Sequence, residues 1–211
     1  MYCPTPFRES RLEVLHSFIC DNPLGLLISN GSNGQTANLL PFTFARGGDE
    51  RGVLRAHIAR SNPQWREIDN QQVLIVFRGP EAYVSPSLYA SKNDSGKVVP
   101  TWNYVMVQAR GRATLRDQQD WLSNQLANLT AAQEAPKPEP WAVTDAPPDY
   151  IEAQMRHIVG FEIEIAAIEG KWKVSQNQPE NNRRSVVEGF ARDAGTHEMA
   201  ELVRVYGKVD G

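Results

Sequence analysis

Short strand patterns, separated by turn residues, fill much of the first half of this 211-residue chain. Apolar and β-branched residues gather at 25–29, 53–58 and 73–77, and a longer run covers 101–115. Arg78-Gly79-Pro80 is predicted to break the third of these strands, and Gly111 is predicted to mark a bulge or a close backbone approach in the last. Residues 30–34 are Asn, Gly and Ser, which tolerate the positive φ angles of a tight hairpin. This spacing predicts an antiparallel meander, because a parallel sheet would need a helix between successive strands.

Four helix patterns flank these strands. Ser10 and Glu13 form a capping box, which places the start of an amphipathic helix that Pro23 ends. The other three helices are predicted to start at Asp117, Asp149 and Thr196. Together the elements predict a β-rich α+β fold in which helices cover a sheet or barrel.

A strand pattern follows the third helix. Residues 161–165 alternate apolar side chains with glutamates, as in a strand with one buried and one solvated face. After Gly170, Lys171 and Lys173 alternate with apolar residues. This predicts a hairpin at Gly170 in which lysines stand opposite glutamates.

Size and composition limit the classes of protein. A chain of 211 residues with 41% hydrophobic residues can build one sizeable core, so we expect residues 1–211 to form one domain. Five prolines fall within residues 131–149, which predicts an irregular surface crossing. A net charge of −3 gives no global positive field for nucleic acid.

Membrane and metal functions find no support in the sequence. No stretch approaches the about 20 apolar residues of a membrane span, and no cluster of Cys and His has metal-ligand spacing. Cys3 and Cys20 follow no export-like segment, so we expect a cytoplasmic protein.

An aromatic run at residues 99–104, read with Tyr83 upstream, is the clearest ligand signal. It combines flat aromatic surface with hydroxyl and amide groups, which suits a planar polar ligand. A buried strand edge whose polar groups pair internally would have the same composition.

A candidate anion site follows the second predicted strand. Arg60 offers a fork of donors, and Ser61 and Asn62 add polar groups for a phosphate or carboxylate. Lys92 could add a further positive charge. A surface arginine before an Asn-Pro turn would explain the same residues. We assign no catalytic residue, because His57 stands alone in a strand pattern.

An ordered series of motifs runs through nearly the whole chain. The series is Met1-Tyr2 with Pro4 and Phe7, Ala59-Arg60 with Asn62-Pro63, Gly79-Pro80 with Tyr83-Val84-Ser85-Pro86, Val99 through Tyr104, Pro140-Trp141, Ile158-Val159-Gly160-Phe161, and Ser175-Gln176-Asn177. It resembles the PaiB family. The resemblance implies an FMN-binding split β-barrel with flanking helices, a homodimer with flavin near the subunit boundary, and a negative transcriptional regulator.

The resemblance also implies which residues contact FMN. Its phosphate would be held by Arg60 and Asn62, beside Ser61, with Lys92 as a helper. The ring or ribityl chain would be lined by Thr101, Trp102 and Asn103, and approached by Gln176. Three positions depart from the family pattern: Leu39 stands where His is common, Leu88 where Trp is common, and Asn182 where Asp is common.

Three functions are compatible with such a protein. The first is a regulator that responds to flavin or another ligand, and the second is a flavin-dependent oxidoreductase acting on a small substrate. The third is haem binding, although no axial ligand can be named. Direct DNA binding is doubtful because no helix-turn-helix with a basic face is recognisable, so we expect any regulation to be indirect.

Overall fold

The computed structural model describes residues 1–47 and 49–209 of the chain. These residues divide into two compact units, each built from segments that are distant in sequence. The central unit comprises residues 12–77 and 108–168, and the terminal unit comprises residues 1–11, 78–107 and 169–209. That residues 1–211 form a single domain stays a prediction.

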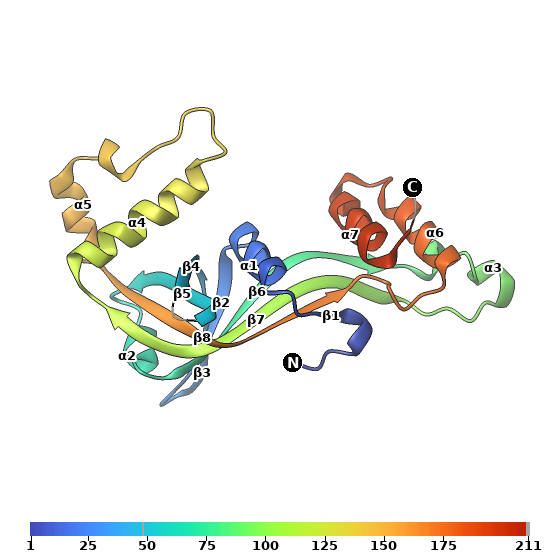
Figure 1. Cartoon of the computed structure of the whole chain (residues 1–211), viewed down its shortest axis with the longest axis horizontal. Helices are drawn as coiled ribbons and strands as arrows, with labels where there is room; N and C mark the ends of the chain where they lie inside the picture. The colour runs from blue at the N-terminus through green and yellow to red at the C-terminus, as the bar shows by residue number, and fades with distance from the viewer. Residues whose placement is uncertain (48, 210–211) are drawn as a thin grey trace. The chain divides into compact units, whose positions relative to one another are not determined.

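Within the described residues, the strands form an eight-stranded antiparallel sheet (Figure 1). The strands are β1 Arg8–Glu9, β2 Leu24–Gly31, β3 Gly34–Pro41, β4 Thr43–Gly47, β5 Asp49–Ala59, β6 Gln72–Val84, β7 Thr101–Arg116 and β8 Ile158–Lys173. Their order is β3-β2-β6-β7-β8-β5-β4, and β1 pairs with β8. The predicted β-rich α+β class is confirmed.

Two predicted interruptions are wrong, because β6 and β8 are continuous strands. A break was expected at Gly79-Pro80, but both residues lie within β6, beyond the segment 74–76 that pairs with β2. Proline is tolerated where no neighbouring strand needs its N–H. A hairpin was expected at Gly170, but this residue pairs with Glu9 of β1, which keeps the chain extended.

Helices flank the sheet, and the structure describes seven of them. They are α1 Leu12–Asp21, α2 Gln64–Ile68, α3 Lys92–Ser95, α4 Gln119–Glu134, α5 Pro148–Met155, α6 Glu180–Phe190 and α7 His197–Gly207. Short 3-10 turns occupy Thr5–Phe7, Pro86–Leu88, Val143–Asp145 and Ala194–Thr196. The helices predicted near residues 12, 117, 149 and 196 are confirmed, whereas α2, α3 and α6 were not predicted.

The start of α4 and the segment after it differ in detail from the prediction. Gln118, not Asp117, is the residue in front of α4, because the Asp117 carboxylate binds Arg60 instead. The helix covers the first four residues of the proline-rich stretch and ends at Glu134. Residues 135–147 then hold only the turn Val143–Asp145.

The core of the central unit is built around three aromatic rings. Phe42 is 2% exposed, and its ring centroid lies 5.7 Å from that of Phe77 and 6.2 Å from that of Phe161, both edge to face. Burial of each such side chain stabilises the fold by about 1.5–3 kcal/mol. Gly111 of β7 packs closely on β8, as predicted: a Cβ atom there would lie 2.0 Å from the Glu164 carbonyl oxygen.

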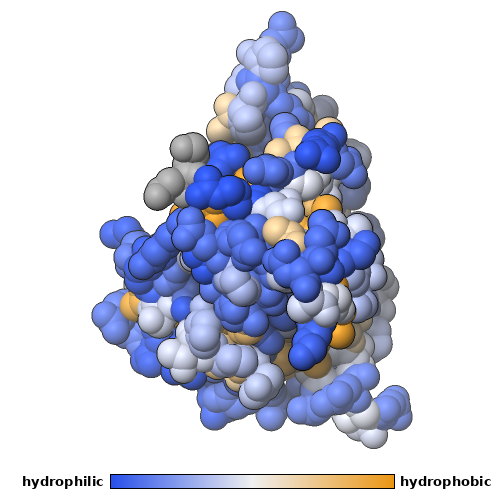
Figure 2. All heavy atoms as spheres, turned by 90° about the vertical axis from the view of Figure 1, so that its right-hand side faces the viewer, coloured by the Kyte–Doolittle hydropathy of each residue, from blue (hydrophilic) through white to orange (hydrophobic). Residues whose placement is uncertain are grey.

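In the terminal unit, α6 and α7 lie side by side on one face of the strands (Figure 1). The Trp172 ring of β8 lies 6.0 Å from the Tyr206 ring of α7, measured between centroids. Trp172, Val105 and Val174 are buried, and Tyr206 is half-buried. The side of the molecule drawn in Figure 2 is mainly hydrophilic, with scattered hydrophobic side chains.

Candidate functional site

Successive residues of β7 point to opposite faces of the sheet in the terminal unit. Asn103 and Val105 are buried, whereas Trp102 between Thr101 and Asn103 is 54% exposed. The Trp102 ring lies 5.8 Å from the ring of Tyr83 on β6, edge to face, and Tyr83 is 49% exposed. The terminal unit therefore presents an aromatic surface to solvent at the position of the predicted ligand signal.

Two lysines of β8 lie on the same side as Tyr104. The Lys171 ammonium lies 5.2 Å from the centre of the Tyr104 ring, and that of Lys173 lies 6.0 Å from it. We call the side chains of Tyr83, Trp102, Tyr104, Lys171 and Lys173 the aromatic–lysine face. In the sequence, the alternation of these lysines indicated only that they stand opposite glutamates across a hairpin. It gave no sign that they lie beside the aromatic run.

The hydrogen bonds of the two lysines go to neutral oxygens. Lys173 Nζ donates to Thr101 Oγ1 at 2.7 Å and to the Trp102 carbonyl oxygen. Lys171 Nζ donates to the Tyr2 carbonyl oxygen at 3.3 Å. Burial lowers the pKa of Lys173, and the positive charge of Lys171 lowers it further.

Asn103 and Gln176, both predicted to contact the cofactor, make internal hydrogen bonds. Asn103 is fully buried, and its Nδ2 donates to Ser175 Oγ at 2.9 Å. Gln176 Oε1 accepts a hydrogen bond from the Val174 backbone N–H at 2.8 Å, and its Nε2 donates to the Trp172 carbonyl oxygen. These contacts fix the chain where it leaves β8, and a flavin contact of either residue stays a prediction.

Lys92 is the first residue of α3 and its side chain is exposed. The segment in front of it is tied to α6 by Asn182, whose Oδ1 accepts from the Ser91 N–H at 3.0 Å and whose Nδ2 donates to Ser91 Oγ at 2.9 Å. Leu88 packs against the same helix, because a Cβ atom at Gly189 would lie 2.5 Å from Leu88 Cδ2. Leu88 and Asn182, two of the three residues that depart from the family pattern, therefore make packing and hydrogen-bond contacts within the terminal unit.

Arg60, Ser61 and Asn62 belong to the central unit. The Arg60 guanidinium donates to Asp117 through Nη1 and Nη2, and also to the carbonyl oxygens of Arg156 and Ile158. Asn62 Oδ1 accepts from the Gln64 N–H at 3.0 Å, while the Ser61 side chain is exposed. A phosphate at Arg60 would therefore have to replace Asp117.

The pocket beside Arg60 is small, and the side chains of Arg60 and Asp117 both line it. Its volume is about 180 Å³, and it is lined by Arg60, Asp117, Gln119, Leu122, Glu152, Met155 and Arg156. The remaining predicted residues, which are Lys92, Thr101, Trp102, Asn103 and Gln176, belong to the terminal unit. The FMN contacts of both groups stay predictions.

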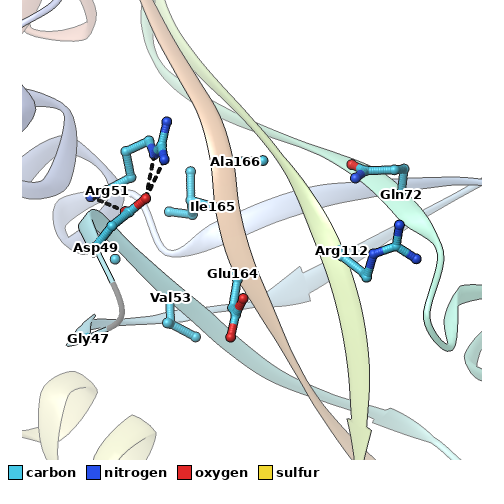
Figure 3. Close-up of a pocket in the computed structure, with 10 residues that line it drawn as sticks. Gly47, Asp49, Arg51, Val53, Gln72, Arg112, Glu164, Ile165 and Ala166 are labelled. Carbon is cyan, nitrogen blue, oxygen red and sulfur yellow. Dashed lines mark hydrogen bonds and ion pairs between the residues drawn. The ribbon is translucent and has the colours of Figure 1, made fainter.

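A larger pocket of about 490 Å³ opens on the central unit (Figure 3). Arg51 folds back onto Asp49 there, with its Nε 3.0 Å from Asp49 Oδ2, while Arg112 donates to the side chain of Asn70 at 3.1 Å. Glu164, which pairs with Val53 of β5, also lines this pocket. The pocket contains none of the residues predicted to bind FMN.

The fold changes the pKa of His57. Burial lowers that pKa, and within residues 1–47 and 49–209 its Nδ1 has no hydrogen-bond partner. The same residues contain no group of three or more His, Cys, Asp or Glu side chains able to hold a metal ion. None of their helices is long and apolar enough to cross a membrane.

Known proteins match both the sequence and the fold. A family described as "Putative FMN-binding domain" matches residues 1–167. "Protease synthase and sporulation protein PAI 2" of Bacillus subtilis is 31% identical over 206 residues, covering 96% of each chain. "Uncharacterized protein AN0679" of Emericella nidulans is 32% identical over 248 residues, covering 99% of this chain and 98% of its own.

Two solved structures are similar in fold. The flavocytochrome Anf3 from Azotobacter vinelandii has a TM-score of 0.57 at 14% identity, over 79% of this chain and 69% of its own. The FAD and heme binding protein from Mycobacterium smegmatis has a TM-score of 0.57 at 15% identity, over 79% of this chain and 73% of its own. The predicted split β-barrel with flanking helices is confirmed.

Proposed function

The chain belongs to the PaiB family of FMN-binding proteins, and we propose that it is a negative transcriptional regulator that uses bound FMN as its signal. FMN is the cofactor of the family. The name of the B. subtilis relative refers to protease synthase and sporulation. By analogy, this chain would act on the expression of other proteins through a partner rather than through a DNA contact of its own.

The observation that carries the proposal is the half-exposed aromatic pair of Tyr83 and Trp102. Both rings are open to solvent and stand 5.8 Å apart, so a planar ring system can pack against them. The Thr101 hydroxyl and the Lys173 ammonium lie at the border of this surface and can bind polar atoms of a ligand. When bound, FMN supplies two-electron redox chemistry, while these residues bind and orient it.

We also propose that the protein works as a homodimer. On the central unit, Leu39 of β3 is 61% exposed and Leu24 of β2 is 55% exposed. Leu26 stands opposite Leu39 on one side and Val76 on the other, which continues the apolar row across three strands. Exposed apolar rows of this kind are typical of protein interfaces.

A flavin-dependent oxidoreductase is the second candidate. The same exposure of Tyr83 and Trp102 favours it, because a flavin resting on an open surface can be reached by a small reductant or substrate. Flavin chemistry needs no acid or base from the protein in order to transfer a hydride.

The first experiment tests FMN binding at this surface. We expect the purified protein to show flavin absorption. FMN titration should give a dissociation constant that rises about 2- to 13-fold in Trp102→Ala, because one aromatic contact contributes about 0.5–1.5 kcal/mol. Trp141→Ala is the matched control, since Trp141 is 45% exposed but lies outside the aromatic–lysine face. Equal affinities in the wild type and Trp102→Ala would remove this surface as the binding site.

A second experiment separates regulator from enzyme. Transcript levels are compared in cells that contain no protein, the wild type or Trp102→Ala, and the purified proteins are assayed for NADH and NADPH oxidation. A regulator represses a set of transcripts, loses repression with Trp102→Ala and shows no turnover. Turnover by the FMN-loaded protein without any change in transcripts would favour the oxidoreductase.

A further inference from the structure

Lys171 and Lys173 form a pair of positive charges that has no counter-ion in the described part of the chain. Lys171 is only 9% exposed, and its ammonium contacts the Tyr2 carbonyl oxygen and the rings of Tyr2 and Tyr104. Glu169, two residues earlier on β8, binds the Met1 amino group at 3.0 Å. Carbonyl oxygens and aromatic rings compensate a buried ammonium only in part, so an anion at this pair would be stabilised.

The pair lies beside the surface proposed for FMN. Lys173 Nζ is hydrogen-bonded to Thr101 Oγ1 and to the Trp102 carbonyl oxygen, which belong to the residues expected to line the flavin. Lys171 lies on the same side of β8, and both ammonium groups lie near the Tyr104 ring. A negative charge that forms on a ring resting there would lie within the field of two cations.

Reduction of FMN creates such a charge. A reduced nicotinamide donates a hydride to N5 of the flavin and becomes the oxidised pyridinium. The two electrons and the proton of the hydride stay on the flavin, and one negative charge is left on the N1–C2–O2 edge of the ring. Both lysines keep their protons. Oxidised FMN carries no ring charge, so the lysines interact more strongly with the reduced form.

We propose that the Lys171–Lys173 pair makes the site bind reduced FMN more tightly than oxidised FMN, so that occupancy follows the redox state. This inference rests on the proposed FMN site and specifies its regulation. A ligand shifts an equilibrium only through differential affinity, and here the two oxidation states of one cofactor differ in affinity. A tenfold preference for the reduced form raises the midpoint potential of bound FMN by about 30 mV over free FMN.

The test measures affinity and potential separately. Oxidised FMN is titrated into the protein, and the potential of the bound cofactor is then measured by anaerobic dithionite titration with a reference dye. The main variant is Lys173→Gln, because Lys173 is less buried than Lys171; Lys171→Met is the second variant. Lys173→Arg keeps the charge, and Lys97→Gln removes an exposed lysine outside the face. Thermal melting confirms that each variant is folded.

We expect the wild-type potential to lie at least about 30 mV above that of free FMN, a tenfold preference. Lys173→Gln should lower it by about the same amount, because it should weaken the binding of reduced FMN about tenfold more than the binding of oxidised FMN. Lys171→Met should act in the same direction, and Lys173→Arg and Lys97→Gln should match the wild type.

Two results would overturn the inference. The first is an unchanged potential in folded, FMN-loaded Lys173→Gln. The second is that Lys173→Gln loses affinity for oxidised and reduced FMN equally and binds riboflavin as the wild type does. Because riboflavin has no phosphate, that result would assign the lysines to the phosphate group. If the wild type takes up no FMN in the first titration, the proposed function itself fails, and that result is distinct from both.

Discussion

The Arg60 guanidinium and the Asp117 carboxylate form a two-pronged ion pair between the end of β5 and the segment after β7. Arg60 Nη2 lies 2.5 Å from Asp117 Oδ1, and Nη1 lies 3.2 Å from Oδ2. The side chains are 39% and 54% exposed, so the pair itself adds at most about 1 kcal/mol to stability. A phosphate that binds Arg60 competes with this carboxylate.

Two substitutions test this competition. We expect Arg60→Ala to weaken FMN binding by about 1.5–3 kcal/mol, because a charge-assisted phosphate contact is lost. Asp117→Asn should tighten FMN binding, because it frees the guanidinium. FMN titrations of both variants and the wild type decide the matter. Identical affinities in all three would leave Arg60 with only its structural contacts to Asp117, Arg156 and Ile158.

The Asn103–Ser175 pair is expected to stabilise the terminal unit. Both residues are buried and hydrogen-bonded to each other. Asn103→Ala should lower the free energy of unfolding by about 1–3 kcal/mol, because it leaves the Ser175 hydroxyl buried without its partner. The double variant with Ser175→Ala should cost less than the sum of the single variants, measured by urea unfolding. Strict additivity would mean that the two side chains are not coupled.

Acid should destabilise the protein through His57. Burial lowers the pKa of His57 below its ordinary value of 6.5. The folded state therefore disfavours the protonated ring, and the stability gained by keeping it neutral is present above pH 6.5 and lost as the pH falls towards the folded pKa. On the face of the sheet that carries His57, the neighbouring charged residues include Arg55 of β5 and Glu162 of β8. His57→Gln should flatten the fall of unfolding free energy on acidification, and an unchanged slope would argue against this role.

Gly111 is expected to tolerate no side chain. A Cβ atom at this position would lie 2.0 Å from the Glu164 carbonyl oxygen, which belongs to the backbone and cannot turn aside. Gly111→Ala should therefore lower the free energy of unfolding by about 1–3 kcal/mol. Gly47→Ala is the matched control, because a Cβ atom there would meet no atom of the described residues within 4 Å. Equal melting temperatures of the two variants would contradict the close approach of β7 and β8.

The proposed homodimer can be tested at Leu39. Leu39→Asp places a charge in the exposed apolar row of β2 and β3, so we expect it to shift the protein towards monomer in sedimentation velocity runs. Val205→Asp is the control, since Val205 is 67% exposed on α7 and belongs to the terminal unit, not to that row. If Leu39→Asp sediments as the wild type does, this face is not the dimer contact.

Local patterns in the sequence predicted much of the fold. The apolar alternation at residues 161–165 identified a strand, because side-chain periodicity depends on neighbouring residues. The Ser10–Glu13 pattern identified α1, but the predicted capping box is wrong: the helix begins at Leu12, and the N–H groups of Ser10 and Arg11 donate to the Glu9 carboxylate. Gly111 indicated a close approach of two strands, because a residue without a side chain can be recognised from the sequence alone. The ordered motifs also identified the family and its cofactor.

The contacts of charged groups could be found only in the tertiary structure. The alternation of Lys171 and Lys173 predicts that they stand opposite glutamates across a hairpin, but β1 holds Gly170 in an extended strand, and both lysines lie beside Tyr104. Arg60 looked free to hold an anion, yet a carboxylate 57 positions along the chain reaches it. Periodicity specifies which face a side chain takes, whereas its partner depends on which distant segments the sheet brings together.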